Sequence, residues 1–155
     1  MRLVGGEFRG RTIRTGEGPG YRPATGRVRE SLFSMLDSLG LDWFGLDVLD
    51  GFAGSGALGF EALSRGARRA VFVERSDKAA RIIRENAALL GLRQDRCMVH
   101  REDVVRFLLQ GPPMDFGLCF LDPPYGLGLL EPALEALVRS RRLRSGGILC
   151  AEIER

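Results

Sequence analysis

The pattern of apolar and polar positions changes near residue 40. Before that point, one helical period runs from Thr25, a candidate N-cap, to Gly40, with apolar residues repeating at helical spacing. Short apolar pairs around glycines in residues 1–13 predict a small hairpin, and the Gly- and Pro-rich residues 16–23 predict a loop. Residues 1–40 are therefore expected to form an arm, a β-hairpin followed by a helix.

After residue 40, short apolar runs alternate with helical periods. The predicted strands are 46–50, 70–74, 97–100, 116–121 and 147–153, and the predicted helices are a segment ending near 64, then 77–90, 104–109 and 129–138. Strands separated by helices imply right-handed crossovers and a parallel sheet covered on both faces. Residues 41–155 are thus predicted to form the core, a doubly wound, mostly parallel, Rossmann-like α/β sheet.

Composition narrows the class of protein. The 155 residues are 45% hydrophobic and 28% charged, which suits one globular domain and argues against disorder. No run of 18 apolar residues exists, and the first residues lack the apolar stretch of a secretory signal. Cys97, Cys119 and Cys150 form no CxxC pair and are expected to be buried thiols. We therefore expect a cytoplasmic protein with no membrane association.

Basic charge is concentrated in the arm. Residues 1–30 hold seven arginines and three glutamates, whereas the rest of the chain has nearly equal numbers of bases and acids. A basic arm on a near-neutral body favours a polyanionic partner such as nucleic acid. Lys78 is the only lysine, so arginine is preferred throughout the chain and a solvated arginine-rich surface remains an alternative.

A glycine-rich loop follows the first predicted strand of the core. Within residues 50–59, Gly54, Gly56 and Gly59 match G-x-G-x-x-G between a strand and a helix, a pattern that lets backbone approach a ligand at a helix N-terminus. The ligand could be a dinucleotide or a nucleoside with an amino-acid tail. Asp50 favours the second, because a carboxylate there would repel pyrophosphate and suits the cationic sulfonium of S-adenosylmethionine.

Two further acids end neighbouring strands. Glu74 follows the second predicted strand of the core, where a carboxylate can accept hydrogen bonds from both ribose hydroxyls of either ligand. Asp103 follows the third, where it could accept from an adenine amino group, cap the helix beginning at Val104, or do both.

The run Asp122-Pro123-Pro124-Tyr125 follows the fourth predicted strand of the core. Consecutive prolines restrict the backbone and remove two N–H donors, so the loop presents carbonyl oxygens and one carboxylate. Such acceptors suit a flat base with an exocyclic amino group: its N–H groups would bond Asp122 and the Pro123 carbonyl while its ring stacks on Tyr125. The alternative is a proline-stiffened turn with a core tyrosine.

Together these motifs resemble the class I S-adenosylmethionine-dependent methyltransferases that act on exocyclic amines. The resemblance rests on Asp50-x-Phe-Ala-Gly-Ser-Gly and Asp122-Pro-Pro-Tyr. Two motifs in the arm narrow the resemblance to one family: Gly5-Gly6-x-x-Arg9-Gly10-Arg11 and Arg22-Pro23-x-Thr25-x-Arg27. They resemble the bacterial 16S rRNA (guanine(966)-N2)-methyltransferases.

This resemblance implies a residue for each role. Candidate catalytic residues are Asp122, Pro123, Pro124 and Tyr125. Candidate cofactor-binding residues are Asp50, Phe52, Ala53, Gly54, Ser55, Gly56, Glu74, Arg75, Asp103 and Val104. Candidate RNA-binding residues are Arg9, Arg11, Arg22, Thr25, Arg27 and Arg29. Methyl transfer would convert S-adenosylmethionine to S-adenosylhomocysteine without a metal, and the lone His100 is expected to be structural.

The resemblance also implies a partner and an architecture. We expect a monomer that acts on 16S rRNA in the small ribosomal subunit. The family normally continues past the fifth strand with an antiparallel pair, so we expect a sheet that lacks its last two strands and has an exposed edge. The alternative functions are an adenine-N6 DNA methyltransferase, a nicotinamide-dependent oxidoreductase and a non-catalytic RNA-binding module.

Overall fold

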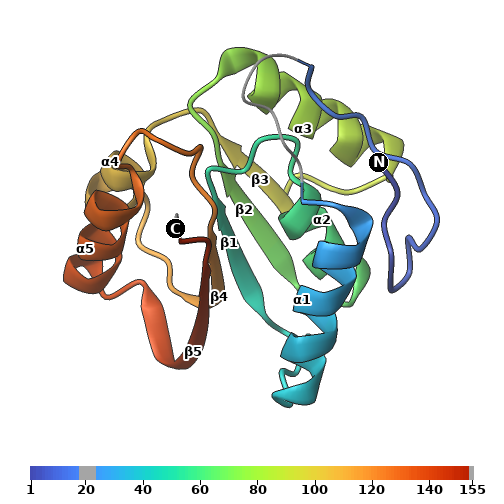
Figure 1. Cartoon of the computed structure of the whole chain (residues 1–155), viewed down its shortest axis with the longest axis horizontal. Helices are drawn as coiled ribbons and strands as arrows, with labels where there is room; N and C mark the ends of the chain where they lie inside the picture. Colours follow the sequence, from blue (N-terminus) through green and yellow to red (C-terminus); the bar gives the residue numbers. More distant parts are fainter. Residues whose placement is uncertain (18–23, 154–155) are drawn as a thin grey trace.

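The computed structural model describes residues 1–17 and 24–153 as a three-layer α/β/α arrangement (Figure 1). The strands are β1 Asp47–Gly51, β2 Arg69–Val73, β3 Cys97–His100, β4 Phe116–Leu121 and β5 Leu143–Ala151. The helices are α1 Gly26–Ser38, α2 Ala57–Ser64, α3 Asp77–Leu89, α4 Val104–Gln110 and α5 Leu130–Ser140. The predicted alternation of strands and helices is therefore confirmed.

All pairings in the five-stranded sheet are parallel, in the order β3-β2-β1-β4-β5. The chain winds outward from β1 to β3, then crosses back to β4 on the other side of β1. The strand order consequently reverses between β1 and β4, which is where ligands bind in open α/β sheets. There Gly51 pairs with Leu121, so the loops that follow these residues leave the sheet next to each other.

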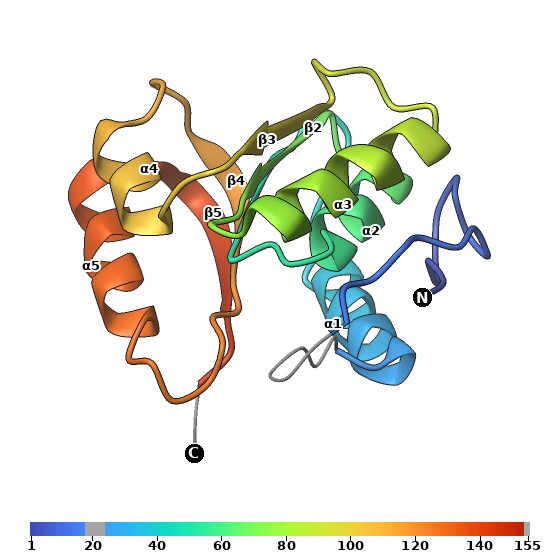
Figure 2. The same cartoon turned by 90° about the horizontal axis from the view of Figure 1, so that it is seen from above.

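Helices cover the two faces of the sheet in separate groups (Figure 2). One apolar cluster joins one face to α1, α2 and α3, and includes Phe33, Phe60 and Phe72. A second cluster joins the opposite face to α4 and α5, and includes Phe107 and Leu137. Because successive side chains of a strand point to opposite faces, Val48 and Leu49 of β1 enter different clusters. This two-sided burial explains the continuous apolar runs of β4 and of most of β2.

Most predicted elements differ from the observed ones by one or two residues at an end, and two differ by more. The fifth strand begins at Leu143 and ends at Ala151, whereas residues 147–153 were expected. Its register against β4 shifts between Phe116 and Leu118, whose partners are Leu143 and Ile148, so the intervening residues bulge out of the ladder. In the arm, the expected hairpin strands are reduced to a single antiparallel bridge between Arg2 and Thr12.

The edge strands of the described sheet are β3 and β5. Two further strands beyond β5 do not occur within residues 24–153, and the sheet there has five. In the described part of the chain, no helix is long and apolar enough to span a membrane.

Candidate active site

Acidic side chains hold the glycine loop in place. After β1, the Gly54 N–H donates to Glu74 Oε2 at 2.8 Å, and the Gly59 N–H donates to Asp50 Oδ2 at 2.9 Å. Phe52 has a φ of 58°, an unusual backbone conformation for a bulky residue. The glycine motif is therefore held by hydrogen bonds to Glu74 and Asp50, the same two acids that the sequence predicts for cofactor binding.

Packing explains the last glycine of the motif. Phe60 of α2 and Phe72 of β2 form a tilted aromatic pair with ring centroids 4.8 Å apart. A Cβ on Gly59 would overlap the Phe72 ring, and one on Gly56 would lie 2.7 Å from the Phe60 ring. The absence of side chains at these positions lets α2 lie close against the sheet, which fixes the direction in which its N-terminus points.

The Asp50 carboxylate lies within electrostatic reach of two others at this edge, those of Asp122 and Glu74. Asp50 is almost fully buried, and burial raises its pKa well above the usual value, although the hydrogen bond from Gly59 opposes the rise. The negative charges of Asp122 and Glu74 raise the pKa of Asp50 further. A cation bound between these groups would relieve both the burial cost and the repulsion.

The Asp122-Pro-Pro-Tyr loop leaves β4 beside this cluster. Asp122 and Pro123 are half-buried, while Pro124 and Tyr125 are exposed, and Tyr125 has 56% of its surface accessible. An exposed aromatic ring is available for stacking, and the alternative of a core tyrosine is therefore wrong. The loop offers a carboxylate near the sheet and a ring toward solvent.

Glu152 is a site residue that the sequence analysis missed. Its N–H donates to the Leu121 carbonyl at 3.2 Å, continuing the pairing of Leu121 with Ala151 and placing Glu152 beside Asp122. Burial, followed by the hydrogen bond and charge of Glu152, raises the pKa of Asp122 to about 7. The only local signal was an acid directly after the last strand, the position at which β2 and β4 also carry one.

The remaining candidate cofactor residues lie along the same edge. Asp103 is exposed and caps α4, with its Oδ1 accepting from the Arg106 N–H at 3.1 Å. Val104 is buried beneath the sheet edge, and Arg75 is exposed after β2. The capping role of Asp103 uses one carboxylate oxygen and is compatible with a ligand on the other.

The candidate RNA-binding residues differ in their exposure to solvent and in their contacts. Arg9 and Arg27 are exposed, as is Arg11, whose Nη2 donates to the Leu89 carbonyl at 2.6 Å. Thr25 caps α1 by accepting from the Val28 N–H at 3.3 Å. Arg22 lies outside the described residues.

Arg29 does not present its guanidinium to solvent. It is 2% exposed and donates to the backbone carbonyls of Ala24 and Arg2, both at 2.8 Å. Its expected role as a surface contact for RNA is therefore corrected: Arg29 joins the start of α1 to the beginning of the arm. Charge counting could not separate this buried arginine from the exposed ones.

Buried polar residues of α2 dock the arm against the core. Glu61 is fully buried and accepts from the Val4 N–H at 3.0 Å and the Gly5 N–H at 2.7 Å. Ser64 accepts from the Phe8 N–H at 2.9 Å. A Cβ on Gly6, whose φ is +74°, would overlap the Ser64 carbonyl, so the paired glycines of the arm motif permit this close approach.

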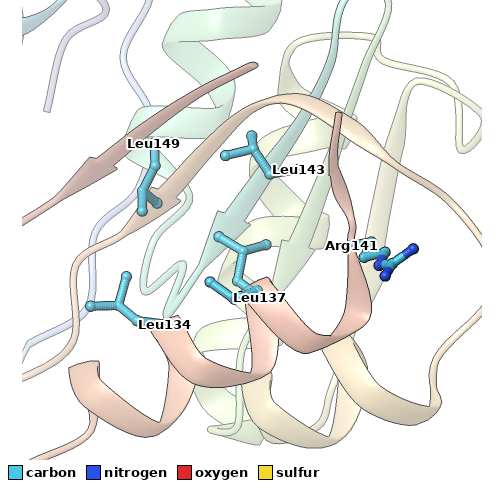
Figure 3. A pocket seen from close by; sticks show the side chains of 6 residues that line it. Leu134, Leu137, Arg141, Leu143 and Leu149 are labelled. Atoms are coloured by element: carbon cyan, nitrogen blue, oxygen red, sulfur yellow. The ribbon is translucent and has the colours of Figure 1, made fainter. Parts of the chain in front are cut away.

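An apolar hollow of about 290 Å³ lies elsewhere, between α5 and β5 (Figure 3). Its lining is Leu134, Leu137, Val138, Arg141, Leu143 and Leu149. None of these residues belongs to the loops after β1 or β4, and apart from Arg141 all are aliphatic. The hollow is separate from the acidic edge, and Arg141 is the one polar side chain in its lining. Among the described residues, no cluster of three or more His, Cys, Asp or Glu side chains is arranged to hold a metal ion.

The reversed strand order, the glycine loop and the acids at the strand ends define a Rossmann-like methyltransferase of the S-adenosylmethionine-dependent class. Over residues 1–155 the sequence matches the family described as conserved hypothetical protein 95, and the chain belongs to that family.

Named relatives are similar over nearly the whole chain. Ribosomal RNA small subunit methyltransferase D of Escherichia coli (strain K12) is 37% identical, across 99% of this chain and 75% of the relative. The protein of the same name from Haemophilus influenzae is 34% identical, across 100% of this chain and 79% of the relative.

Solved structures agree with the fold. The Escherichia coli protein yhhF superposes with a TM-score of 0.83 at 34% identity, covering 96% of this chain and 78% of that one. The Thermus thermophilus protein TTHA0928 superposes with a TM-score of 0.82 at 34% identity, covering 97% of this chain and 84% of that one.

Proposed function

We propose that this protein transfers the methyl group of S-adenosylmethionine to the exocyclic N2 of a guanine in the 16S rRNA of the small ribosomal subunit, the guanine at position 966 being the expected target. The observation that carries the proposal is the pairing of Gly51 with Leu121, which brings the glycine loop and the Asp122-Pro-Pro-Tyr loop to one point on the sheet. The names of relatives at 34% and 37% identity support the choice of substrate.

The acidic edge fits the proposed cofactor. S-adenosylmethionine, when bound, supplies an electrophilic methyl group attached to a positively charged sulfur. The buried Asp50 would stabilise the positive end of the cofactor, Glu74 would accept from the ribose hydroxyls and the free oxygen of Asp103 would accept from the adenine amino group. A nicotinamide dinucleotide fits less well, because its pyrophosphate would lie near Asp50, whose carboxylate is already repelled by those of Asp122 and Glu74.

Asp122 is the proposed catalytic residue. Its carboxylate and the Pro123 carbonyl would accept the two amino hydrogens of the base, while the ring stacks on the exposed Tyr125. Such contacts hold the nitrogen lone pair in line with the methyl carbon and contribute through positioning. When nitrogen gains the methyl group it becomes positively charged, and the Asp122 carboxylate stabilises that charge and accepts the proton that nitrogen releases.

Exposed arginines of the arm would bind the RNA backbone. Arg9, Arg11 and Arg27 are exposed and lie on the segment that carries the excess of positive charge. Phosphate contacts of this kind position an RNA without reading its sequence. The target base must leave its stack to reach the strand ends, so the arm would hold the surrounding RNA while the base enters the site.

Radiolabelled methyl transfer tests this function. Purified protein is incubated with labelled S-adenosylmethionine and, separately, small ribosomal subunits lacking the modification, deproteinised 16S rRNA, or duplex DNA. Label in N2-methylguanine of the rRNA is the expected result, with an Asp122→Asn variant as the inactive control. Label in N6-methyladenine of DNA would contradict the proposed substrate, and absence of label from every acceptor would contradict the proposed activity.

A further inference from the structure

Asn86 connects two parts of the site that are distant in sequence. It lies in α3, is fully buried, and contacts both the arm and the glycine loop. No catalytic or cofactor role was expected for this residue, and the proposed methyl transfer does not use it. A fully buried amide is retained only where its hydrogen-bonding groups are satisfied, so its partners are informative.

Toward the arm, the Asn86 amide forms two hydrogen bonds with the backbone of one residue. Asn86 Oδ1 accepts from the Arg14 N–H at 2.7 Å, and Asn86 Nδ2 donates to the Arg14 carbonyl at 2.9 Å. The side chain thereby satisfies both backbone groups of Arg14, much as a neighbouring strand would. This fixes the position of the arm backbone at Arg14.

Toward the cofactor loop, the same amide uses its second hydrogen. Asn86 Nδ2 donates to the carbonyl of Ser55 at 3.2 Å, at the centre of the glycine motif. The neighbouring Gly54 N–H is held from the other side by Glu74. The loop that would surround the cofactor is therefore fastened to the arm through a single side chain.

The orientation of this amide is uniquely determined. A primary amide has one acceptor oxygen and one nitrogen with two donor hydrogens. Rotating it by half a turn would direct its N–H groups at the Arg14 N–H and its oxygen at the Ser55 carbonyl, leaving buried groups unsatisfied. The same planar group bonds both segments, so a shift of the amide that follows one segment alters its hydrogen bonds to the other.

We propose that Asn86 is a positioning residue that couples cofactor binding to the order of the RNA-binding arm. A bound adenosyl compound restrains the loop at Ser55, the restrained loop holds the Asn86 amide, and the amide holds Arg14. By thermodynamic reciprocity, RNA that orders the arm strengthens cofactor binding by the same factor. This inference rests on the proposed function, since it takes the loop as the cofactor site and the arm as the RNA site.

Amide hydrogen exchange followed by NMR tests the coupling without measuring activity. In the wild-type protein, saturating S-adenosylhomocysteine is expected to slow exchange of the Arg14 amide by about fivefold, at the low end of typical coupling between sites. In Asn86→Ala, the Arg14 amide is expected to exchange faster and to give no response to S-adenosylhomocysteine, although calorimetry still detects binding of the compound.

Glu85→Ala is the matched control. Glu85 adjoins Asn86 and forms an exposed ion pair with Arg14 at 2.8 Å, but it has no contact with the loop. This variant loosens the arm from α3 and is expected to keep the wild-type response to S-adenosylhomocysteine. If general loosening of the arm were enough to abolish the response, Glu85→Ala would lose it as well, so the contrast between the two variants separates coupling from loosening.

The possible results are distinguishable. An unchanged response in Asn86→Ala, or no response at Arg14 in a wild-type protein that binds S-adenosylhomocysteine, would overturn the coupling and leave the proposed function standing. Failure of the wild-type protein to bind the compound would overturn the proposed function itself. If Asn86→Ala does not fold, Asn86→Asp, which keeps an acceptor for Arg14 but loses the amide donors, is expected to lose the response instead.

Discussion

Gly51 and Leu121 lie opposite each other in neighbouring parallel strands, and a Cβ on Gly51 would approach Leu121 Cδ2 to 2.8 Å. This close pairing joins β1 and β4 where the strand order reverses. Each strand is followed by a loop with a different proposed role, cofactor binding after Gly51 and base binding after Leu121. The proposed methyl transfer requires the two ligands to meet in line, and in that proposal this strand pair would set the distance between them.

The Asp122 carboxylate is predicted to be required for chemistry and dispensable for cofactor binding. Asp122→Asn keeps the size of the side chain but replaces one acceptor with a donor facing the amino group of the base. We expect methyl transfer to fall by at least about 100-fold, the lower range for loss of a general base, with S-adenosylhomocysteine affinity changed less than about threefold. Single-turnover transfer and calorimetry measure the two quantities, and an active Asp122→Asn protein would refute the assigned role.

Activity should depend on pH through Asp122. Burial and the neighbouring Glu152 raise its pKa to about 7, and in the proposed mechanism the ionised form accepts the amino hydrogens. kcat/KM is therefore expected to increase as pH rises toward about 7 and to level off above it.

Glu152→Gln removes the neighbouring negative charge and should move that rise to lower pH. Glu131→Gln, an exposed acid in α5, is the matched control and should leave the profile unchanged. Profiles of kcat/KM between pH 5 and 9 provide the comparison. A Glu152→Gln profile identical to the wild type would show that the two carboxyl groups do not interact.

The exposed and buried arginines of the arm should differ in their effect on RNA binding. Arg9→Ala removes a candidate phosphate contact, so RNA affinity should fall and the slope of log affinity against log salt should decrease by about 0.7–1. Arg29→Ala removes a buried guanidinium that bonds two backbone carbonyls, so thermal stability should fall. Filter binding across a salt series and thermal unfolding measure these effects, and an unchanged slope in Arg9→Ala would exclude that contact.

Gly59 is predicted to be needed for packing. Gly59→Ala would push a methyl group into the Phe72 ring and should lower the free energy of unfolding by about 1–3 kcal/mol. Gly26→Ala places the same methyl group at the start of α1, where no described residue beyond its chain neighbours and its own helix's backbone lies within 4 Å, and should be neutral or stabilising by up to about 1 kcal/mol. Urea unfolding measures the stability of both variants. Equal stabilities of Gly59→Ala and Gly26→Ala would show that the sheet adjusts to accommodate the added methyl group.

Local sequence patterns predicted most of the fold. Residues 97–100 and 116–121 were predicted as strands with the observed bounds, and the candidate loops after β1 and β4 were located by their glycines and prolines. These features depend on apolar periodicity, capping and backbone restriction, and each of these properties is determined by residues that are close together in the sequence. The fifth strand was predicted less well, because its bulge arises from pairing with β4.

The sequence by itself determined which chemical groups the protein has, and that they follow the strands of an α/β sheet. Only the tertiary structure decided which of them meet: Glu152 beside Asp122, Asn86 between Arg14 and Ser55, and Arg29 inside rather than on the surface. Register and packing bring together residues separated by 30 positions or more, as with Asn86 and Ser55. No periodicity along the chain encodes such a contact, since it depends on how complete elements pack in space.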